Sequence, residues 1–165
     1  MSVAARNLRD AVITIKDGSA TPNTLIVSPD NGDLSFTVHS PTVTILNRGA
    51  LHSKRAGNDQ EVDVSFSFMF TQWENAMGAT GVSVPDALQK RGGASAWVTA
   101  DANVCNIYSV DLVFEITDPC DPTKKETINI SNFHAETLVF TEGETADKIS
   151  VTGKAFVTTV DSTYA

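Results

Sequence analysis

The clearest indication of the fold is the sequence Glu61-Val62-Asp63-Val64-Ser65-Phe66-Ser67-Phe68-Met69-Phe70-Thr71. Apolar and polar side chains alternate along it with a period of two, which is typical of a β-strand with one buried face. The apolar face predicts a set of core residues: Val62, Val64, Phe66, Phe68 and Phe70. Burial of a phenylalanine contributes roughly 1.5–3 kcal/mol, so we expect this strand at the centre of a β-rich core.

Other short segments with strand character lie on both sides of this stretch. The predicted strands are Val12–Lys16, Thr24–Ser28, Leu34–Val38, Thr42–Leu46, Ala96–Thr99, Ile107–Thr117, Glu126–Asn132, Glu136–Thr141 and Ile149–Val160. Turn signals such as Asn31-Gly32 and the proline-containing loop 118–122 separate them. Alternation within Ile107–Thr117 adds Leu112, Phe114 and Ile116 to the predicted core.

The segment Val84–Arg91 predicts one short helix. Pro85 suits a first turn, Asp86 suits the positive helix end, and Gly92-Gly93 ends the pattern. Many strands, one helix and no βαβ alternation predict a mainly β fold. We expect two packed antiparallel sheets, as a β-sandwich or partly closed barrel, with one short flanking α-helix.

The length of 165 residues predicts one domain, 1–165. Within it, residues 1–11 are interpreted as a polar N-terminal arm, loose or docked on a neighbour. Residues 47–60 are interpreted as a long polar loop, which is unusual between two strands and is commonly functional.

Composition argues against several classes of function. The net charge is −8 and there is no run of Lys and Arg, so a surface that grips nucleic acid is not expected. No apolar stretch approaches the roughly 20 residues of a membrane span, and no apolar segment of a signal peptide follows Met1. The two cysteines, Cys105 and Cys120, are expected to be free thiols in a reducing cytoplasm.

Catalytic and metal-binding patterns are also missing. His39, His52 and His134 have no ligand spacing, and no nucleophile elbow or phosphate loop is present. Asp111 and Glu115 share a strand face but lie about 13 Å apart along it, which is too wide for a retaining glycosidase pair. We therefore expect no enzyme, no metal and no cofactor.

Three sequence elements together carry a resemblance: Gly32-Asp33-Leu34-Ser35-Phe36, then Asn47-Arg48-Gly49, then Asp59 to Phe68. This order resembles the major tail tube proteins of long-tailed, siphovirus-like bacteriophages. The resemblance implies six-membered rings that stack into a hollow tube, with strands of every subunit joined in one inner barrel. It also implies a virion tail assembled in the host cytoplasm. The chain size and the absence of any sheath-related feature favour a non-contractile tail, and a contractile tail stays open as the alternative.

The resemblance further implies partners. The chain would bind itself, a tape-measure protein, a tail terminator and distal tail proteins, and DNA would pass through the tube without specific binding. A polar, sparsely charged wall suits such passage, because it does not hold phosphates. The predicted lumen-lining residues are Asp63, Ser65, Ser67, Asp111 and Glu115, and the alternative is that they face ordinary solvent.

The loop 47–60 is predicted to dock on the neighbouring ring. Its candidate contact residues are Arg48, Lys54, Arg55 and Asp59, and the alternative is a solvated surface loop. A different class of function also stays open, namely a carbohydrate-binding or adhesion β-sandwich. In that case Trp73 and Trp97 would be stacking platforms for sugars.

Overall fold

The computed structural model describes residues 11–27, 34–70, 81–118, 120–143 and 147–164. In chain order the elements are β1 (Ala11–Lys16), β2 (Thr24–Val27), β3 (Ser35–Thr37), β4 (Thr42–Asn47), β5 (Ala50–Ala56), β6 (Val62–Phe70), α2 (Val84–Gln89), a 3-10 turn (Gly92–Ala94), β7 (Val110–Asp118), β8 (Asp121–Thr141), β9 (Asp147–Ala155) and β10 (Asp161–Tyr164). The prediction of a mainly β fold with two antiparallel sheets and one short α-helix is confirmed for the described residues.

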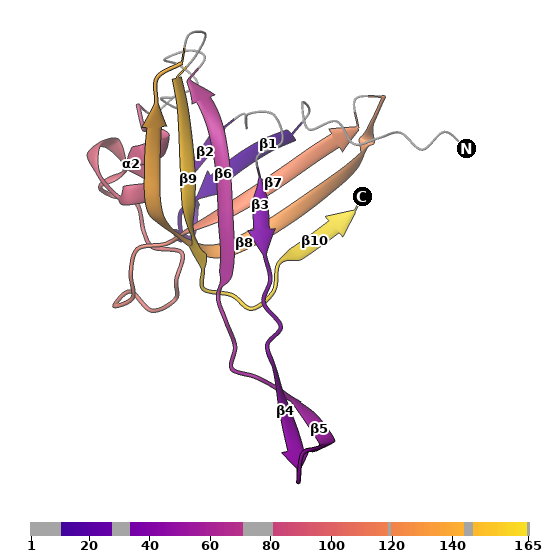
Figure 1. Ribbon diagram of the computed structural model, residues 1–165. Helices are drawn as coiled ribbons and strands as arrows, with labels where there is room; N and C mark the ends of the chain where they lie inside the picture. The colour runs from indigo at the N-terminus through magenta and orange to yellow at the C-terminus, as the bar shows by residue number, and fades with distance from the viewer. Residues whose placement is uncertain (1–10, 28–33, 71–80, 119, 144–146, 165) are drawn as a thin grey trace.

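The larger sheet has the strand order β2-β1-β7-β8-β9-β6-β3, with β10 paired to β8, and the smaller sheet is the β4–β5 pair. The long strand β8 divides the larger sheet into two layers (Figure 1). Its first half pairs with β7, and its second half pairs with β9. The sheet is open, and its two layers enclose the core in the manner of a sandwich.

A bend at Asn132 allows β8 to change layers. Asn132 has a φ of 54°, and the register of β8 on β7 shifts next to it, between the partners of Val110 and Leu112. The Asp111 carboxylate accepts a hydrogen bond from the Asn132 N–H at 2.9 Å, which holds this unusual backbone. The next residue, Phe133, is fully buried and is opposite both Val110 of β7 and Ala155 of β9.

The core contains most of the apolar face predicted from the sequence. Val62, Val64, Phe66, Phe68, Leu112 and Phe114 are each no more than 4% exposed. Ile116 is half-buried against them, and the side chain of Phe70 lies outside the described part of the chain. The rings of Phe66 and Phe133 lie 5.9 Å apart, so the two layers meet at the bend of β8.

The segment Ala96–Thr99 is not a strand, contrary to the prediction. Its backbone instead binds the β1–β2 turn, because the Val98 N–H donates to the Asp17 carboxylate and the Gly18 N–H donates to the Val98 carbonyl. Burial raises the pKa of Asp17, but hydrogen bonds from Asn23, Ser19 and Val98 outweigh it and hold that pKa below its usual value.

Several predicted boundaries also differ. The predicted strand Ile107–Thr117 begins at Val110 as β7, and the predicted strand Ile149–Val160 ends at Ala155 as β9. Glu126–Asn132 and Glu136–Thr141 belong to one strand, β8, because the backbone stays paired through the bend. The helix ends at Gln89, since Lys90 adopts a left-handed conformation as its C-cap. Residue 11 of the predicted arm belongs to β1, whereas residues 1–10 lie outside the described residues.

Candidate assembly surfaces

The segment predicted as a long loop, 47–60, is largely strand. Residues 50–56 form β5, which pairs antiparallel with β4 from Thr42↔Ala56 to Asn47↔Ala50. Arg48 and Gly49 connect the strands with φ values of 50° and 83°, as in a type I′ hairpin turn. β4 contains the predicted strand Thr42–Leu46. β5 was not predicted, because apolar, polar and charged side chains are mixed along it without a period of two.

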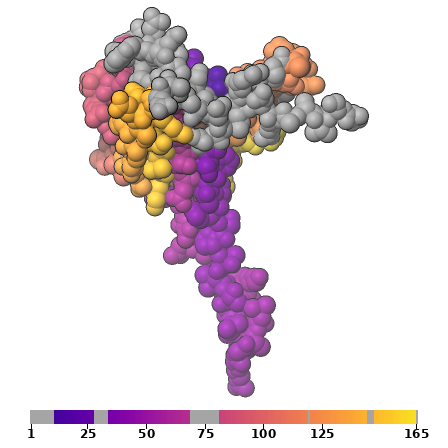
Figure 2. Space-filling view, turned by 45° about the horizontal axis from the view of Figure 1, so that its top comes forward, coloured from indigo at the N-terminus to yellow at the C-terminus, as the bar shows by residue number. Residues whose placement is uncertain are grey.

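The β4–β5 hairpin projects from the sandwich as a narrow arm (Figures 1 and 2). Nearly every side chain in it is exposed, including Val43 at 52%, Leu46 at 59% and Leu51 at 68%. An isolated two-stranded hairpin is marginally stable in water. An exposed hairpin with large apolar side chains is therefore a surface suited to a partner.

The hairpin is also basic. Residues 42–56 include Arg48, Lys54 and Arg55 and no Asp or Glu, so removing these three charges from the net charge of −8 leaves −11 on the rest of the chain. None of the three cations forms an ion pair with a residue that the structure describes. The fourth residue of the predicted contact set, Asp59, lies beyond β5 at the base of the hairpin.

Two contacts hold the neck of the hairpin. The Gly57 N–H donates to the Pro41 carbonyl at 2.8 Å, and His39 Nε2 lies 2.7 Å from Asp63 Oδ2. A Cβ at Gly57 would lie 3.0 Å from the Pro41 Cβ, so the two chains pass closely here. The neck therefore fixes where the hairpin leaves the sandwich.

The second surface is the layer formed by β3, β6, β9 and the second half of β8. Neighbouring strands in this layer are all antiparallel. Its two outer edges, β3 on one side and residues 134–141 of β8 on the other, pair with no further strand among the described residues. Open edges of this kind present unpaired backbone groups to a neighbouring chain.

The five predicted lumen-lining residues do not share one surface. Asp63 and Ser65 lie on the outer face of the β6 layer, with Ser35 and Thr37 opposite them on β3. Ser67 belongs to the same face by alternation but is only 3% exposed. This burial in the single chain does not support Ser67 as a lining residue, and its place in a channel stays a prediction.

Asp111 and Glu115 lie on β7, in the other layer. Asp111 is half-buried at the β8 bend, and burial raises its pKa more than the Asn132 N–H and Lys16 lower it. Glu115 forms an ion pair with Lys125 at 3.3 Å. Because the two layers of a sandwich turn their outer faces to different sides, one channel cannot be lined by both sets from the same copy.

The outer face of the β6 layer is close to charge balance. Asp63 and Glu136 lie on it together with Lys148 and Lys154 of β9, whose side chains alternate with buried ones. Lys154 also forms an ion pair with Glu61 at 3.4 Å. The face is therefore polar and mixed in charge.

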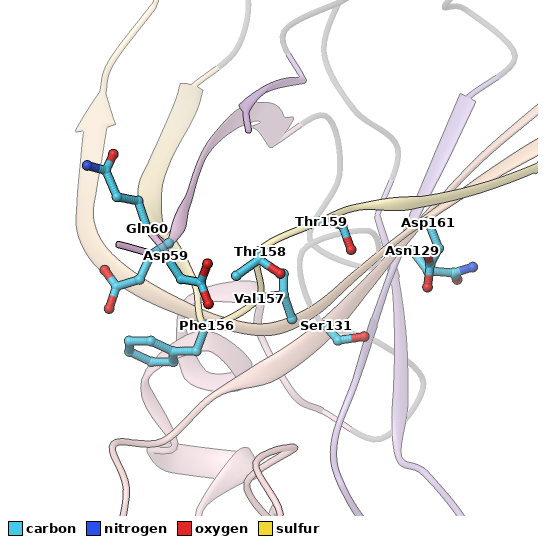
Figure 3. Close-up of a pocket in the computed structure, with 10 residues that line it drawn as sticks. Asp59, Gln60, Asn129, Ser131, Phe156, Val157, Thr158, Thr159 and Asp161 are labelled. Carbon is cyan, nitrogen blue, oxygen red and sulfur yellow. The ribbon is translucent and has the colours of Figure 1, made fainter. Parts of the chain in front are cut away.

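A groove lies at the base of the hairpin (Figure 3). It is formed by Asp59, Gln60 and Glu61 before β6, by Asn129 and Ser131 of β8, by residues 156–159 after β9, and by Asp161 of β10. Phe156 and Val157 are half-buried in it, and no Lys or Arg lines it. Neither Asp59 nor Asp161 forms an ion pair with a described residue.

The described residues offer little support for sugar binding or metal binding. Trp97 is 6% exposed and belongs to the core, which removes it as a sugar platform, and Trp73 lies outside the described residues. Cys105 and Cys120 are free and exposed. Within the described ranges no group of three or more His, Cys, Asp or Glu residues is placed to hold a metal ion. No helix in those ranges has the length and apolar character to cross a membrane.

Neither a family model nor a curated protein matches the sequence. Solved structures do match the fold. A chain of the sheath–tube complex of an extracellular contractile injection system gives a TM-score of 0.57 at 12% identity, over 98% of this chain and 93% of that one. A chain of the tube-terminating cap of the anti-feeding prophage gives 0.57 at 12% identity, over 100% and 95%. A chain of the sheath/tube terminator of the first system gives 0.52 at 12% identity, over 92% of both. The chain therefore has the fold found in tube and tube-cap components of tail-like injection systems.

Proposed function

We propose that this chain is a structural, non-enzymatic subunit of a hollow tail tube, built from stacked rings of its copies. The observation that carries the proposal is the β4–β5 hairpin, which is exposed, basic and unpacked in the single chain. Such a segment is stabilised once a neighbouring copy covers it. The fold shared with tube and cap components of injection systems supports the same function.

Ring closure in this proposal uses the open edges of the β6 layer. The layer has four strands of alternating direction, so its two edge strands, β3 and β8, run in opposite directions. Rotation about an axis along the strands preserves strand direction. The β8 edge of one copy then meets the β3 edge of the next in antiparallel orientation, and heterologous contacts of this kind close into rings. Six copies per ring is the number that the resemblance implies.

The same arrangement assigns the lumen to one face. The outer face of the β6 layer, with Asp63 and Ser65, lines the tube, and the β7 face with Asp111 and Glu115 faces away from it. DNA and a tape-measure protein are the proposed passengers, and a tail terminator and distal tail proteins are the proposed partners. Assembly would take place in the host cytoplasm and the product would be a virion tail, with or without a sheath.

Negative-stain electron microscopy of the purified protein tests the proposed function. We expect rings and hollow tubes at high protein concentration, because both surfaces belong to one chain and need no second component. Protein that stays monomeric at all concentrations and binds glycans would contradict the proposal and support the adhesion alternative.

The lumen assignment predicts a gain of DNA binding in the variant Asp63→Lys. Replacing this exposed carboxylate by an ammonium raises the net charge of a nearly balanced face by two units per copy. Tubes assembled around DNA should then retain it, with affinity at least about tenfold higher at low salt than wild type. Nuclease protection of the bound DNA measures retention inside the tube.

Glu115→Lys is the matched control for this variant. It makes the same change of charge on the β7 layer, so we expect any DNA that it binds to remain open to nuclease. Protection by the Glu115 variant and not by the Asp63 variant would reverse the assignment of the two faces.

A further inference from the structure

The tip of the hairpin carries a specific combination of side chains. Leu46 and Leu51 are opposite each other in the register of β4 and β5, and both are more than half exposed. Arg48 occupies the turn between them. The tip thus presents two apolar side chains and a cation at the end of a narrow arm (Figure 2).

The groove at the base of the hairpin offers the complementary chemistry (Figure 3). Phe156 and Val157 supply partly exposed apolar surface, and Asp59 and Asp161 supply carboxylates. Since no Lys or Arg lines the groove, these two carboxylates are uncompensated there. A leucine pair with an adjacent guanidinium fits such a site by both hydrophobic contact and charge.

The length of the hairpin determines which neighbouring copy its tip can contact. Its own tip extends away from the sandwich (Figure 1), whereas the groove is lined by residues at the hairpin base. The 11 residues from Val38 to Arg48 span about 36 Å at ~3.3 Å per residue, whereas the nine residues of β6 span about 30 Å. A hairpin that descends from one copy is therefore about as long as the layer of the copy stacked beneath it, and its tip reaches the base of that copy.

We infer that the hairpin tip of one copy docks in the groove at the hairpin base of the copy stacked beneath it, with Arg48 next to Asp161. This inference rests on the proposed stacking of rings and adds the identity of the receiving surface. The occupant is a second copy of this chain. The contact is head-to-tail, so it repeats along the tube without closing.

A charge exchange tests the docking. Arg48→Glu alone and Asp161→Arg alone should each raise the critical concentration for tube formation at least about tenfold, because like charges then face each other in a desolvated contact. The double variant Arg48→Glu with Asp161→Arg restores the pair and should assemble within about threefold of wild type. Sedimentation of tubes across a concentration series measures all three values.

The control double variant is Arg48→Glu with Glu142→Lys. It has the same net charge as the exchange, but Glu142 is exposed at the far end of β8, so we expect no recovery. Assembly of either single variant at the wild-type concentration, or no recovery in the exchange variant, would overturn the docking while wild-type tubes still support the proposed function. Absence of tubes from the wild type would instead contradict the proposed function. Circular dichroism of the monomers establishes that each variant is folded.

Discussion

Replacing Val43–Arg55 with an Asn-Gly turn should give a folded monomer that forms no tubes at any concentration. Thr42 and Ala56 are cross-strand partners, so a two-residue turn joins them without moving the rest of the chain. The removed side chains are almost all exposed in the single chain. The free energy of unfolding should therefore change by less than about 1 kcal/mol.

Assembly is expected to respond much more strongly than stability. The deletion removes every contact that the hairpin makes with a neighbouring copy, and sedimentation with electron microscopy measures the loss. Val104→Ser is the control, since Val104 is 76% exposed in a loop of the sandwich and its loss tests a general effect of surface hydrophobicity. Tubes of normal appearance from the deletion variant would rule out the hairpin as an assembly element.

Phe133→Ala should have the largest effect on stability. Phe133 is fully buried at the bend of β8, where its ring lies 5.9 Å from that of Phe66. A Cβ at Gly153 would lie 2.9 Å from the Phe133 ring, so the ring lies close against the backbone of the neighbouring strand β9. Truncation of such a phenylalanine costs about 3–5 kcal/mol, a large part of the roughly 5–15 kcal/mol that stabilises a typical domain.

Phe140→Ala provides the matched comparison on the same strand. Phe140 is 61% exposed, so the same truncation should cost less than about 0.5 kcal/mol. Urea unfolding of the two monomers gives both values. Equal losses in the two variants would show that the bend of β8 is not a centre of the core.

The sequence predicted the parts of the fold that depend on one strand at a time. The apolar face of β6 was readable because a buried face and a solvated face alternate with a period of two. The continuity of β8 was not readable, because it depends on the left-handed backbone of Asn132 and on its hydrogen bond to Asp111. That hydrogen bond joins residues 21 positions apart in the sequence.

The prediction of the candidate surfaces is limited in the same way, because it also rests on patterns along single strands. Alternation indicates which side chains share a face of one strand, but it does not say in which layer the strand lies. Asp63 and Asp111 were therefore placed on one predicted surface, although β6 and β7 belong to different layers. Ser67 follows the alternation and is nevertheless buried, which the pattern along one strand does not predict.

The narrow neck at Pro41 and Gly57 has a mechanical consequence. In a stack of rings linked by hairpins, each hairpin joins its own sandwich through the two chain segments of the neck. The Gly57–Pro41 hydrogen bond and the His39–Asp63 contact hold these two segments together. Such links resist stretching along the tube, because the peptide chain itself bears the tension. They resist tilting weakly, because the described residues of the neck, 38–41 and 57–60, are exposed or half-buried in the single chain. A tube of this construction would curve under load while its rings remained intact.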